Sequence, residues 1–136
     1  MATITPYLLY ADVDAALAWL HDAFGFEEVL RYDDGGTVTH AEARLDEAVV
    51  YLGHPGPDYR GPGAGAGVTV MLHAEVDDVA AHHARASAAG AAVGDLEDTP
   101  YGERRYRAVD LEGHEWFFAS RVREVAPEDW GAVSSS

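Results

Sequence analysis

The chain contains no cysteine. Disulfide bonds, thiolate metal ligands and cysteine-based redox chemistry are therefore excluded for its own residues. The absence fits a reducing compartment such as the cytoplasm, although it does not require one.

Long apolar runs are also missing. No stretch approaches the ~18 apolar residues that a membrane helix needs, and the first residues, MATITPYLLYAD, lack the basic segment of a secretory signal. We therefore expect a soluble, cytoplasmic protein. Its 136 residues, of which 48% are hydrophobic and 10% aromatic, are enough for one domain with a substantial core.

Basic residues are scarce. Nine Lys and Arg stand against 24 Asp and Glu, which gives a formal charge of -15. Such a surface repels nucleic-acid phosphates and anionic lipids, so neither nucleic acid nor a membrane is expected as a partner. A negative surface attracts cationic small molecules. The same net charge is also common in proteins where it serves only to keep the protein soluble.

Two stretches of the chain follow the same pattern. In the first, a short apolar run leads to Asp12, a residue suited to cap a helix, and Gly25 ends that helix. In the second, residues 68–76 lead to Asp77 as the cap, and Gly90 ends the helix. Apolar residues recur at helical spacing in both, and the distance from cap to glycine is the same.

Three strand-like runs follow each helix. They are predicted at 26–32, 37–45 and 48–52 after the first helix, and at 91–96, 104–110 and 114–121 after the second. The pattern predicts an α+β protein made of two βαβββ repeats. We expect a single domain at 1–124, with repeats at about 3–53 and 67–122, a Gly- and Pro-rich linker at 54–66 and a loosely held tail at 125–136.

Two βαβββ halves resemble the vicinal oxygen chelate superfamily, the glyoxalases and bleomycin-resistance proteins. The resemblance extends from Ile4 to about Arg123: YADVDAALAWLHDAFGF is similar to that family's first strand–helix junction, and THAEARLDEAVVYLG and YGERRYRAVDLEGHEWFFAS look like its PhnB-like branch. It implies the glyoxalase/bleomycin resistance fold, with curved mixed sheets around a central ligand cavity. It also implies a homodimer, because many members share or complete their pockets in this way.

The resemblance further implies four metal-ligand positions, one on the first and one on the last strand of each half. In metal-dependent members, His, Glu or Gln at these positions binds a divalent ion that polarises vicinal oxygens of the substrate. The matching positions in this sequence are Thr5, Tyr51, Met71 and Phe117. Since none of them is a competent ligand, we expect no cofactor and no metal at the usual site.

A displaced polar site is an alternative. Strand alternation places His40 with Glu42 on one face, and Glu115 with Phe117 on another. If these faces line the cavity, His40, Glu42, His73 and Glu115 can converge, either on a displaced metal or as anchors that bind a ligand through hydrogen bonds. With seven histidines in the chain, chance placement on strands explains the pattern as well.

The remaining histidines are expected to have structural roles. His114 takes the face opposite Phe117, toward the helix layer or the rim of the sheet. His21, His82 and His83 lie on the helices, where contact with solvent or with the sheet is the simpler explanation.

Arg104, Arg105 and Arg107 form a basic cluster in an acidic chain. On a strand, Arg105 and Arg107 share one face and Arg104 takes the other. They either neutralise nearby carboxylates such as Glu103 and Asp110, or one of them orients an anionic or carbonyl-bearing ligand. Elsewhere the sequence shows no nucleophilic triad, phosphate-binding loop or paired-carboxylate motif.

The predicted pocket has a largely apolar, aromatic lining with a few polar tips, which suits planar organic molecules. Trp19 or Trp116 is placed behind it, and Tyr59, Arg60 and Tyr101 lie where a lid would be. Core packing explains several of these residues equally well. The pocket residues are Thr5, Tyr7, Tyr51, Met71, His73, Phe117, Tyr101, Arg104 and Glu115, with His40 and Glu42 as polar anchors.

The leading hypothesis is a metal-independent protein that binds and sequesters an aromatic or cationic antibiotic, as bleomycin-resistance-type proteins do. The alternative is a glyoxalase-like lyase, isomerase or dioxygenase with a displaced metal site. A third hypothesis is a subunit or regulatory module with a filled cavity, which acts through its dimer surface. The sequence identifies neither catalytic residues nor the ligand, and it leaves open whether the halves pair within one chain or swap between protomers.

Overall fold

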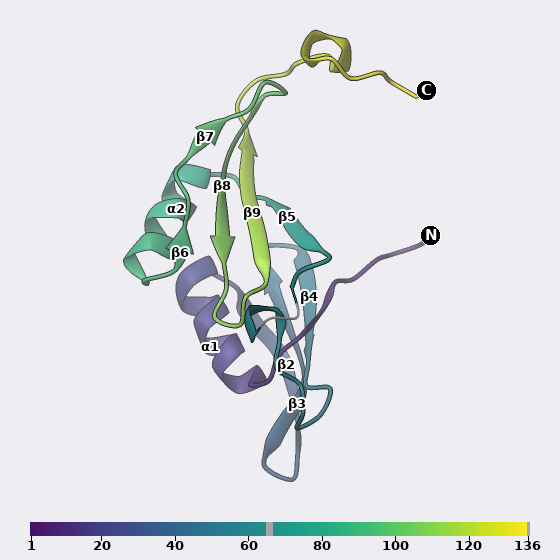
Figure 1. Ribbon diagram of the computed structural model, residues 1–136, viewed down its shortest axis with the longest axis vertical. Helices are drawn as coiled ribbons and strands as arrows, with labels where there is room; N and C mark the ends of the chain where they lie inside the picture. Colours follow the sequence, from purple (N-terminus) through teal and green to yellow (C-terminus); the bar gives the residue numbers. More distant parts are fainter. Residues whose placement is uncertain (65–66, 136) are drawn as a thin grey trace.

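Two βαβββ repeats follow one another along the chain, as the sequence predicts. The computed structural model describes residues 1–64 and 67–135, and Figure 1 shows its elements. The first repeat contains β1 (Tyr7–Leu9), α1 (Val13–Phe24), β2 (Glu27–Asp34), β3 (Thr37–Leu45) and β4 (Ala48–Gly53). The second contains β5 (Met71–Glu75), α2 (Val79–Ala88), β6 (Ala92–Val93), β7 (Glu97–Asp98), β8 (Glu103–Val109) and β9 (Glu115–Arg121).

One predicted strand is interrupted. Residues 91–96 are expected to form a single strand, but the structure forms the two short strands β6 and β7 in this region. Both pair with β8, and the register moves by one residue between them, because Val93 faces Ala108 whereas Glu97 faces Arg105. An extra residue of this kind is a β-bulge, which the alternation of apolar and polar residues does not reveal.

Each repeat forms one mixed sheet. The strand order is β1-β4-β3-β2 in the first sheet and β5-β9-β8-β6 in the second, where β7 also pairs with β8. The first and last strands of each repeat run parallel, and the other neighbours are antiparallel. In the described parts of the chain both sheets are open, and the two clefts described below are open rather than enclosed as the predicted central cavity is.

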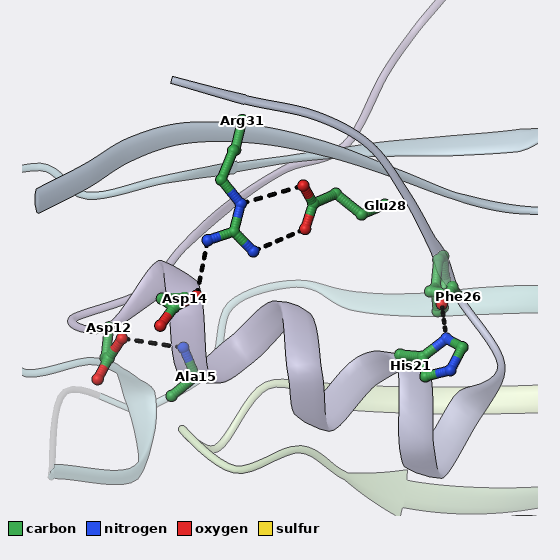
Figure 2. A network of polar contacts seen from close by, with 7 residues as sticks. All are labelled: Asp12, Asp14, Ala15, His21, Phe26, Glu28 and Arg31. Atoms are coloured by element: carbon green, nitrogen blue, oxygen red, sulfur yellow. Dashed lines mark hydrogen bonds and ion pairs between the residues drawn. The ribbon is translucent and has the colours of Figure 1, made fainter. Parts of the chain in front are cut away.

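Side chains fix the start of α1 and hold β2 against it. Asp12 is the helix cap and accepts a hydrogen bond from the Ala15 backbone N–H at 3.0 Å (Figure 2). In the same view Arg31 of β2 reaches Asp14 on the first turn at 2.8 Å and Glu28 on its own strand at 2.7 Å. The hydrogen bond from Arg31 lowers the pKa of the Glu28 carboxyl. The edge strand β2 is thus tied to the helix by an arginine that bridges two carboxylates.

The second helix begins one residue later than predicted. Asp78 rather than Asp77 has the extended backbone of a cap, and its side chain accepts from the Ala81 backbone N–H at 3.0 Å. Either aspartate has the right chemistry for a cap. The helix begins at Val79, and Asp78, which directly precedes it, accepts from the backbone N–H of Ala81.

The helices cover one face of the two sheets, and in Figure 1 they lie together on one side of the strands. The core fills the space between the helices and the sheets, and Trp116, Phe24 and Phe118 are among its largest fully buried side chains. The ring centroid of Phe24 in α1 lies 4.7 Å from that of Phe118 and 5.4 Å from that of Trp116. Because Phe24 belongs to the first repeat and the other two to the second, these ring contacts join the two repeats of the chain.

A buried carboxylate ties the two repeats together at one end. Asp110, in the turn between β8 and β9, accepts hydrogen bonds from the Tyr10 hydroxyl at 2.7 Å and from the Trp116 indole at 3.2 Å. Burial, followed by the negative charge of Asp110, raises the pKa of Tyr10 well above its ordinary value. From the same turn Glu112 accepts from two backbone N–H groups just before α1, at 2.7 and 3.0 Å. We call these contacts of Asp110 and Glu112 the turn latch.

The linker between the repeats docks on the same turn. Its described part contains a short 3-10 helix, Pro62–Ala64, and the Gly63 N–H donates to the Glu112 carbonyl at 3.0 Å. A Cβ atom at Gly113, where φ is 99°, would lie 2.4 Å from the Gly63 nitrogen, so this approach requires glycine. Gly65 and Ala66, which belong to the predicted linker, lie outside the described residues.

The C-terminal tail contains one regular element among its described residues. Pro127–Trp130 forms a second 3-10 helix, and the Trp130 ring lies 5.2 Å from that of Tyr101. Ser136, at the end of the predicted tail, lies outside the described residues. Within residues 1–64 and 67–135, no helix is long and apolar enough to cross a membrane.

Candidate functional site

Most of the predicted site residues lie on the sheet faces that point away from the helices. Side chains alternate along a strand, so the neighbours of buried residues such as Leu52 and Phe118 point to this side. We call the two surfaces the first and the second open face. The first carries Tyr7, His40, Glu42 and Tyr51, and the second carries Met71, His73, Arg105, Glu115 and Phe117.

Two open clefts lie where the repeats meet. The first, of about 570 Å³, lies between the N-terminal segment, the start of β4 and β5, and Thr5 is part of its lining. We call it the β4 cleft. The second, of about 630 Å³, lies between β1, the residues before β5 and β5 itself; it is lined in part by Tyr7 and Met71, and we call it the β1 cleft. Leu72 and His73 line both clefts, so β5 forms their shared wall.

Four residues of the first open face form one cluster. The Tyr7 hydroxyl and Nδ1 of His40 are 2.6 Å apart, and Nε2 of His40 is 3.3 Å from the Glu42 carboxylate. The rings of Tyr7, His40 and Tyr51 meet edge to face in a triangle whose centroid separations are 5.5 to 5.6 Å. We call these four residues the Tyr7 cluster. The sequence predicts each of them in the pocket and puts His40 and Glu42 on one face, but it does not predict their contact with Tyr7 and Tyr51, which come from two other strands.

The second open face carries a different set of contacts. Nε2 of His73 donates to Glu103 at 3.1 Å, and the Glu103 side chain is only 7% exposed. The Arg105 guanidinium lies 4.6 Å from the centroid of the Phe117 ring, a cation–π contact. Glu103 is a residue that sequence reasoning did not place in the site. Its position two residues before Arg105, on the same face of the strand, was the available signal.

The three clustered arginines are paired with carboxylates, but not with the predicted ones. Glu103 bonds His73, and Asp110 belongs to the turn latch. Pairing across strands selects other partners, since β7 and β9 both lie against β8. The pairs are Arg104–Asp98, Arg105–Glu97 and Arg107–Glu115. Arg104 also lies on the helix-facing side of β8, in line with the buried Tyr106, and so away from the open face.

The histidines on the helices have structural contacts, whereas His114, for which only a structural role is expected, also lines the β1 cleft. His82 on α2 accepts from the Tyr106 hydroxyl at 2.5 Å and donates to the Phe24 carbonyl at 2.8 Å. Burial lowers the pKa of His82 below its ordinary value of 6.5. His114 donates to the Leu9 carbonyl at 2.8 Å and so bridges the repeats. His83 bonds the Gly94 carbonyl, and His21 bonds the Phe26 carbonyl, as Figure 2 shows.

The three predicted lid residues lie in different places. The Tyr59 hydroxyl donates to the Leu9 carbonyl at 3.1 Å, and Tyr59 lines the β1 cleft. Arg60 bonds carbonyl groups of its own linker. Tyr101 packs against Trp130 at the outer end of the second sheet and is not part of either cleft lining.

The two tryptophans placed behind the pocket also differ. Trp116 lines the β4 cleft from the helix-facing side of β9. Trp19 packs against Phe24 within α1, with ring centroids 4.9 Å apart, and lines neither cleft. Of the two tryptophans predicted behind the pocket, Trp116 therefore lies beside a cleft and Trp19 does not.

This geometry has relatives among known proteins. The family model described as Glyoxalase/Bleomycin resistance protein/Dioxygenase superfamily matches residues 3–118. The chain belongs to this superfamily.

Three relatives of the superfamily illustrate the match. TioX from Micromonospora sp. ML1 is 35% identical with a TM-score of 0.75, and the alignment covers 90% of this chain and 100% of TioX. The uncharacterized protein Mb0911c of Mycobacterium bovis is 33% identical in an alignment 140 residues long, which covers 98% of this chain and 92% of the relative. TnmS3, an antibiotic binding protein from Streptomyces sp. CB03234, is 17% identical with a TM-score of 0.64, covering 88% of this chain and 97% of TnmS3. At that identity the likeness to TnmS3 concerns the fold alone.

The four positions that the resemblance assigns to metal ligands carry residues that do not fit a divalent ion, and Thr5 lies just before β1 rather than on it. A hard or borderline divalent ion is bound by imidazole and carboxylate groups. Two hydroxyls, a thioether and a hydrocarbon ring do not supply that donor set. The residues are Thr5, Tyr51, Met71 and Phe117.

The displaced polar set does not gather into one site either. Its four members take part in separate pairs on the two open faces. Across residues 1–64 and 67–135, no three His, Asp or Glu side chains are grouped as ligands for one ion. The pairs are His40–Glu42, His73–Glu103 and Glu115–Arg107.

Proposed function

We propose that this protein binds a small planar organic molecule in the β1 and β4 clefts, needs no resident metal to hold it, and acts by sequestering it. The observation that carries the proposal is the pair of open clefts of about 570 and 630 Å³, which share the wall formed by β5 and are lined largely by apolar and aromatic side chains. Clefts of this volume suit drug-sized ligands, and a few polar groups at the rim suffice to orient them.

The class of ligand follows from the lining and from the charge of the chain. Tyr7 and Tyr59 beside the β1 cleft offer aromatic surfaces for stacking. The formal charge of -15 attracts cations over a long range. An aromatic or cationic antibiotic combines both properties. The description of TnmS3, a protein of the same fold, as an antibiotic binding protein is in keeping with this assignment.

The proposed contacts come from the predicted pocket in two groups. Side chains that line a cleft are proposed as direct contacts, and side chains on the open faces beside the clefts are proposed for ligands that extend further. Arg104 faces the helix side and Tyr101 packs at the outer end of the sheet, so we leave both out. The first group is Thr5, Tyr7, Met71 and His73, and the second is His40, Glu42, Tyr51, Glu115 and Phe117.

We further propose a homodimer in which exposed side chains of the edge strands β2 and β5 contact the second copy, while the clefts and the faces beside them stay open to the ligand. Tyr32 on β2 is 59% exposed, and Met71 on β5 is 57% exposed. Large side chains exposed on edge strands offer contact area to a second copy. Sedimentation velocity at micromolar concentration is expected to give one species of twice 14.6 kDa. A monomer at all concentrations would contradict the dimer without touching the binding proposal.

Thermal unfolding in the presence of aromatic antibiotics, both cationic and neutral, tests the binding proposal. A ligand at about 100 times its dissociation constant stabilises the native state by about 2.7 kcal/mol. In a domain of this size that raises the melting temperature by about 5–10 °C. Met71→Trp, which fills the β1 cleft, is expected to abolish the shift, whereas Val122→Trp, at an exposed position outside both cleft linings, is expected to retain it. An unchanged melting temperature with every compound would refute binding.

Chelation tests the independence from metal. Protein dialysed against EDTA is expected to show the same antibiotic-induced rise in melting temperature as untreated protein. Loss of the rise, with recovery on adding a divalent cation, would instead support the rival hypothesis of an enzyme with a displaced metal site.

A further inference from the structure

The Tyr7 cluster has a defined direction of hydrogen bonding. An ionised Glu42 can only accept, so Nε2 of His40 carries the hydrogen that bridges 3.3 Å to the carboxylate. Nδ1 of His40 is then the acceptor for the Tyr7 hydroxyl, 2.6 Å away. The hydrogens of the Tyr7 hydroxyl and of the His40 ring are therefore both used within the cluster.

What the cluster offers to a ligand is acceptor capacity. Oη of Tyr7 keeps its lone pairs, and Glu42 keeps its second carboxylate oxygen and its negative charge. Donation to His40 polarises the Tyr7 oxygen and makes it a better acceptor. Tyr7 is 52% exposed and lines the β1 cleft, so a ligand in that cleft can reach it.

The rings around these acceptors add to the same preference. The triangle of Tyr7, His40 and Tyr51 presents tyrosine π-faces, which carry negative potential and attract cations. Tyr32 lies across from His40 on β2 and extends the aromatic surface. Hydrogen-bond acceptors, a carboxylate and aromatic faces together favour a ligand group that donates hydrogen bonds and carries positive charge.

No basic side chain of the protein already fills this role in the described part of the chain. Arg44 is the nearest arginine along β3, two residues from Glu42 on the same face, and it forms no ion pair with that carboxylate. On the second open face, by contrast, Arg105 and Arg107 both have carboxylate partners. Among the described residues, Glu42 has His40 as its ion-pair partner and no arginine, and it lies beside the exposed ring of Tyr7.

We propose that the Tyr7 cluster is a subsite for an organic ammonium group. The inference rests on the proposed function, since the ammonium group belongs to the ligand held in the β1 cleft. The group lies against the faces of Tyr7 and Tyr51, donates to Oη of Tyr7 and interacts with the charge of Glu42. The aromatic part of the ligand then extends along the cleft toward β5.

Gly53 is the positioning residue of this subsite. It lies opposite His40 in the β3–β4 pairing, and a Cβ atom on it would lie 2.6 Å from Cε1 of Tyr7. The Tyr7 ring thus crosses the sheet in the space that the missing side chain leaves. Gly53→Ala is expected to push the ring away from His40 without removing any atom of the cluster.

Two probes with the same ring test the subsite: phenethylammonium and the neutral 2-phenylethanol. In a titration followed by ¹H–¹⁵N NMR, phenethylammonium is expected to bind about tenfold more tightly and to shift the signals of Tyr7, His40 and Tyr51. Glu42→Gln keeps the shape of the side chain and removes its charge, and it is expected to abolish the preference. Tyr7→Phe and Gly53→Ala are expected to reduce it. Glu128→Gln removes the same charge in the C-terminal 3-10 helix, far along the chain from the cluster, and is expected to leave the preference unchanged.

Equal affinities of the two probes for the wild type would overturn the subsite, as would an undiminished preference in Glu42→Gln with a native melting temperature. If Glu42→Gln does not fold, Tyr7→Phe decides, because it retains the ring and loses the hydroxyl that donates to His40 and accepts from the ligand. Antibiotics that stabilise the protein while the probes show no preference would refute the ammonium subsite and leave sequestration standing. A probe preference that depends on Glu42, without stabilisation by any antibiotic, would support the subsite and refute sequestration.

Discussion

The two repeats share one topology and differ in what they present on their open faces. Each has a parallel pairing between its first and last strands and an aspartate that caps its helix. When the caps are aligned, the positions that correspond on the open faces carry different side chains. The corresponding residues are Tyr7 and His73, Tyr51 and Phe117, and Glu42 and Arg107.

The helix-facing sides are also unequal, but in another way. The helix α1 buries six residues, whereas α2 buries only Val79 and Ala86 within the described structure. The aligned partner of the buried Ala16 in α1 is His82 in α2. The first repeat thus supplies more of the apolar core, and the second supplies polar contacts that fasten it. The helix-facing sides of both repeats pack into one core, so the side chains there must fit each other. The open faces do not share this core, so their side chains differ between the repeats.

The largest effects are expected where the repeats are alike, on the last strand of each. Phe118→Ala is expected to cost about 3–5 kcal/mol and Leu52→Ala about 2–5 kcal/mol of unfolding free energy, because both side chains are fully buried. Their neighbours on the open faces serve as controls: Phe117→Ala and Tyr51→Ala are each expected to cost roughly 1 kcal/mol or less. Urea denaturation of the four variants measures this. If Phe117→Ala and Tyr51→Ala cost as much unfolding free energy as Phe118→Ala and Leu52→Ala, the side chains on the open faces must be as well packed as those of the core.

Weakening the turn latch is expected to cause the next largest loss of unfolding free energy, and the first repeat has a turn at the corresponding place that serves for comparison. Asp110→Asn is expected to cost about 1–3 kcal/mol, since the neutral amide weakens the bonds that a charged carboxylate accepts from Tyr10 and Trp116. Asp46→Asn changes the corresponding turn of the first repeat, where the side chain is exposed and φ is 52°, a conformation that asparagine tolerates. Denaturant unfolding of both variants is the measurement. A loss at Asp46 as large as at Asp110 would show that the latch is not specific to the second repeat.

The polar second helix is expected to make stability depend on pH. Burial lowers the native pKa of His82 below the value of 6.5 that we assign to the unfolded chain. The unfolded chain then binds the proton more readily, so the stabilisation is complete above pH 6.5 and is lost as the pH falls through the native pKa. His82→Gln is expected to flatten the loss of melting temperature between pH 7.5 and pH 5.5, measured by circular dichroism. An unaltered slope would assign the pH dependence to other groups.

The smallest effect is expected at the exposed pair that borders the bulged strand of the second repeat. A hydrogen bond from Arg104 lowers the pKa of Asp98. Arg104→Gln is therefore expected to bring that pKa back toward its ordinary 3.8, as followed by NMR titration of the Asp98 carboxyl group. Because exposed ion pairs contribute little to folding, the melting temperature is expected to stay unchanged. A clear drop in melting temperature would mean that this edge contributes more to the second repeat than its exposure suggests.

The sequence was sufficient for the order of elements and for most of their boundaries. The capping aspartate and terminal glycine of α1, together with its apolar spacing, identify that helix without reference to any other part of the chain. The same local signals misplaced the second cap by one residue, because Asp77 and Asp78 are adjacent and chemically equal. They also missed the bulge between β6 and β7, which depends on how β8 pairs with both strands.

Which side chains share an open face and contact each other was predictable in part. Alternation along single strands correctly grouped His40 with Glu42, and these residues do bond each other. The partners of the arginines were wrong, because proximity along the chain suggested Glu103 and Asp110 where cross-strand pairing selected others. The role of Gly53 was invisible for a related reason: nothing in its immediate neighbours shows that the ring of Tyr7 lies across it.

The sequence by itself determined the two repeats, their helices and strands, and which side chains share a face, because caps, turns and alternation act between residues only a few positions apart. Tertiary structure alone decided which faces meet. Tyr7 reaches His40 across 33 positions, and Tyr10 reaches Asp110 across 100. Such contacts depend on the register of paired strands and on the packing of one repeat against the other. These are properties of the whole fold, and they are the reason that an acceptor-rich aromatic cluster is found on the first open face and a buried latch at the turn of the second repeat.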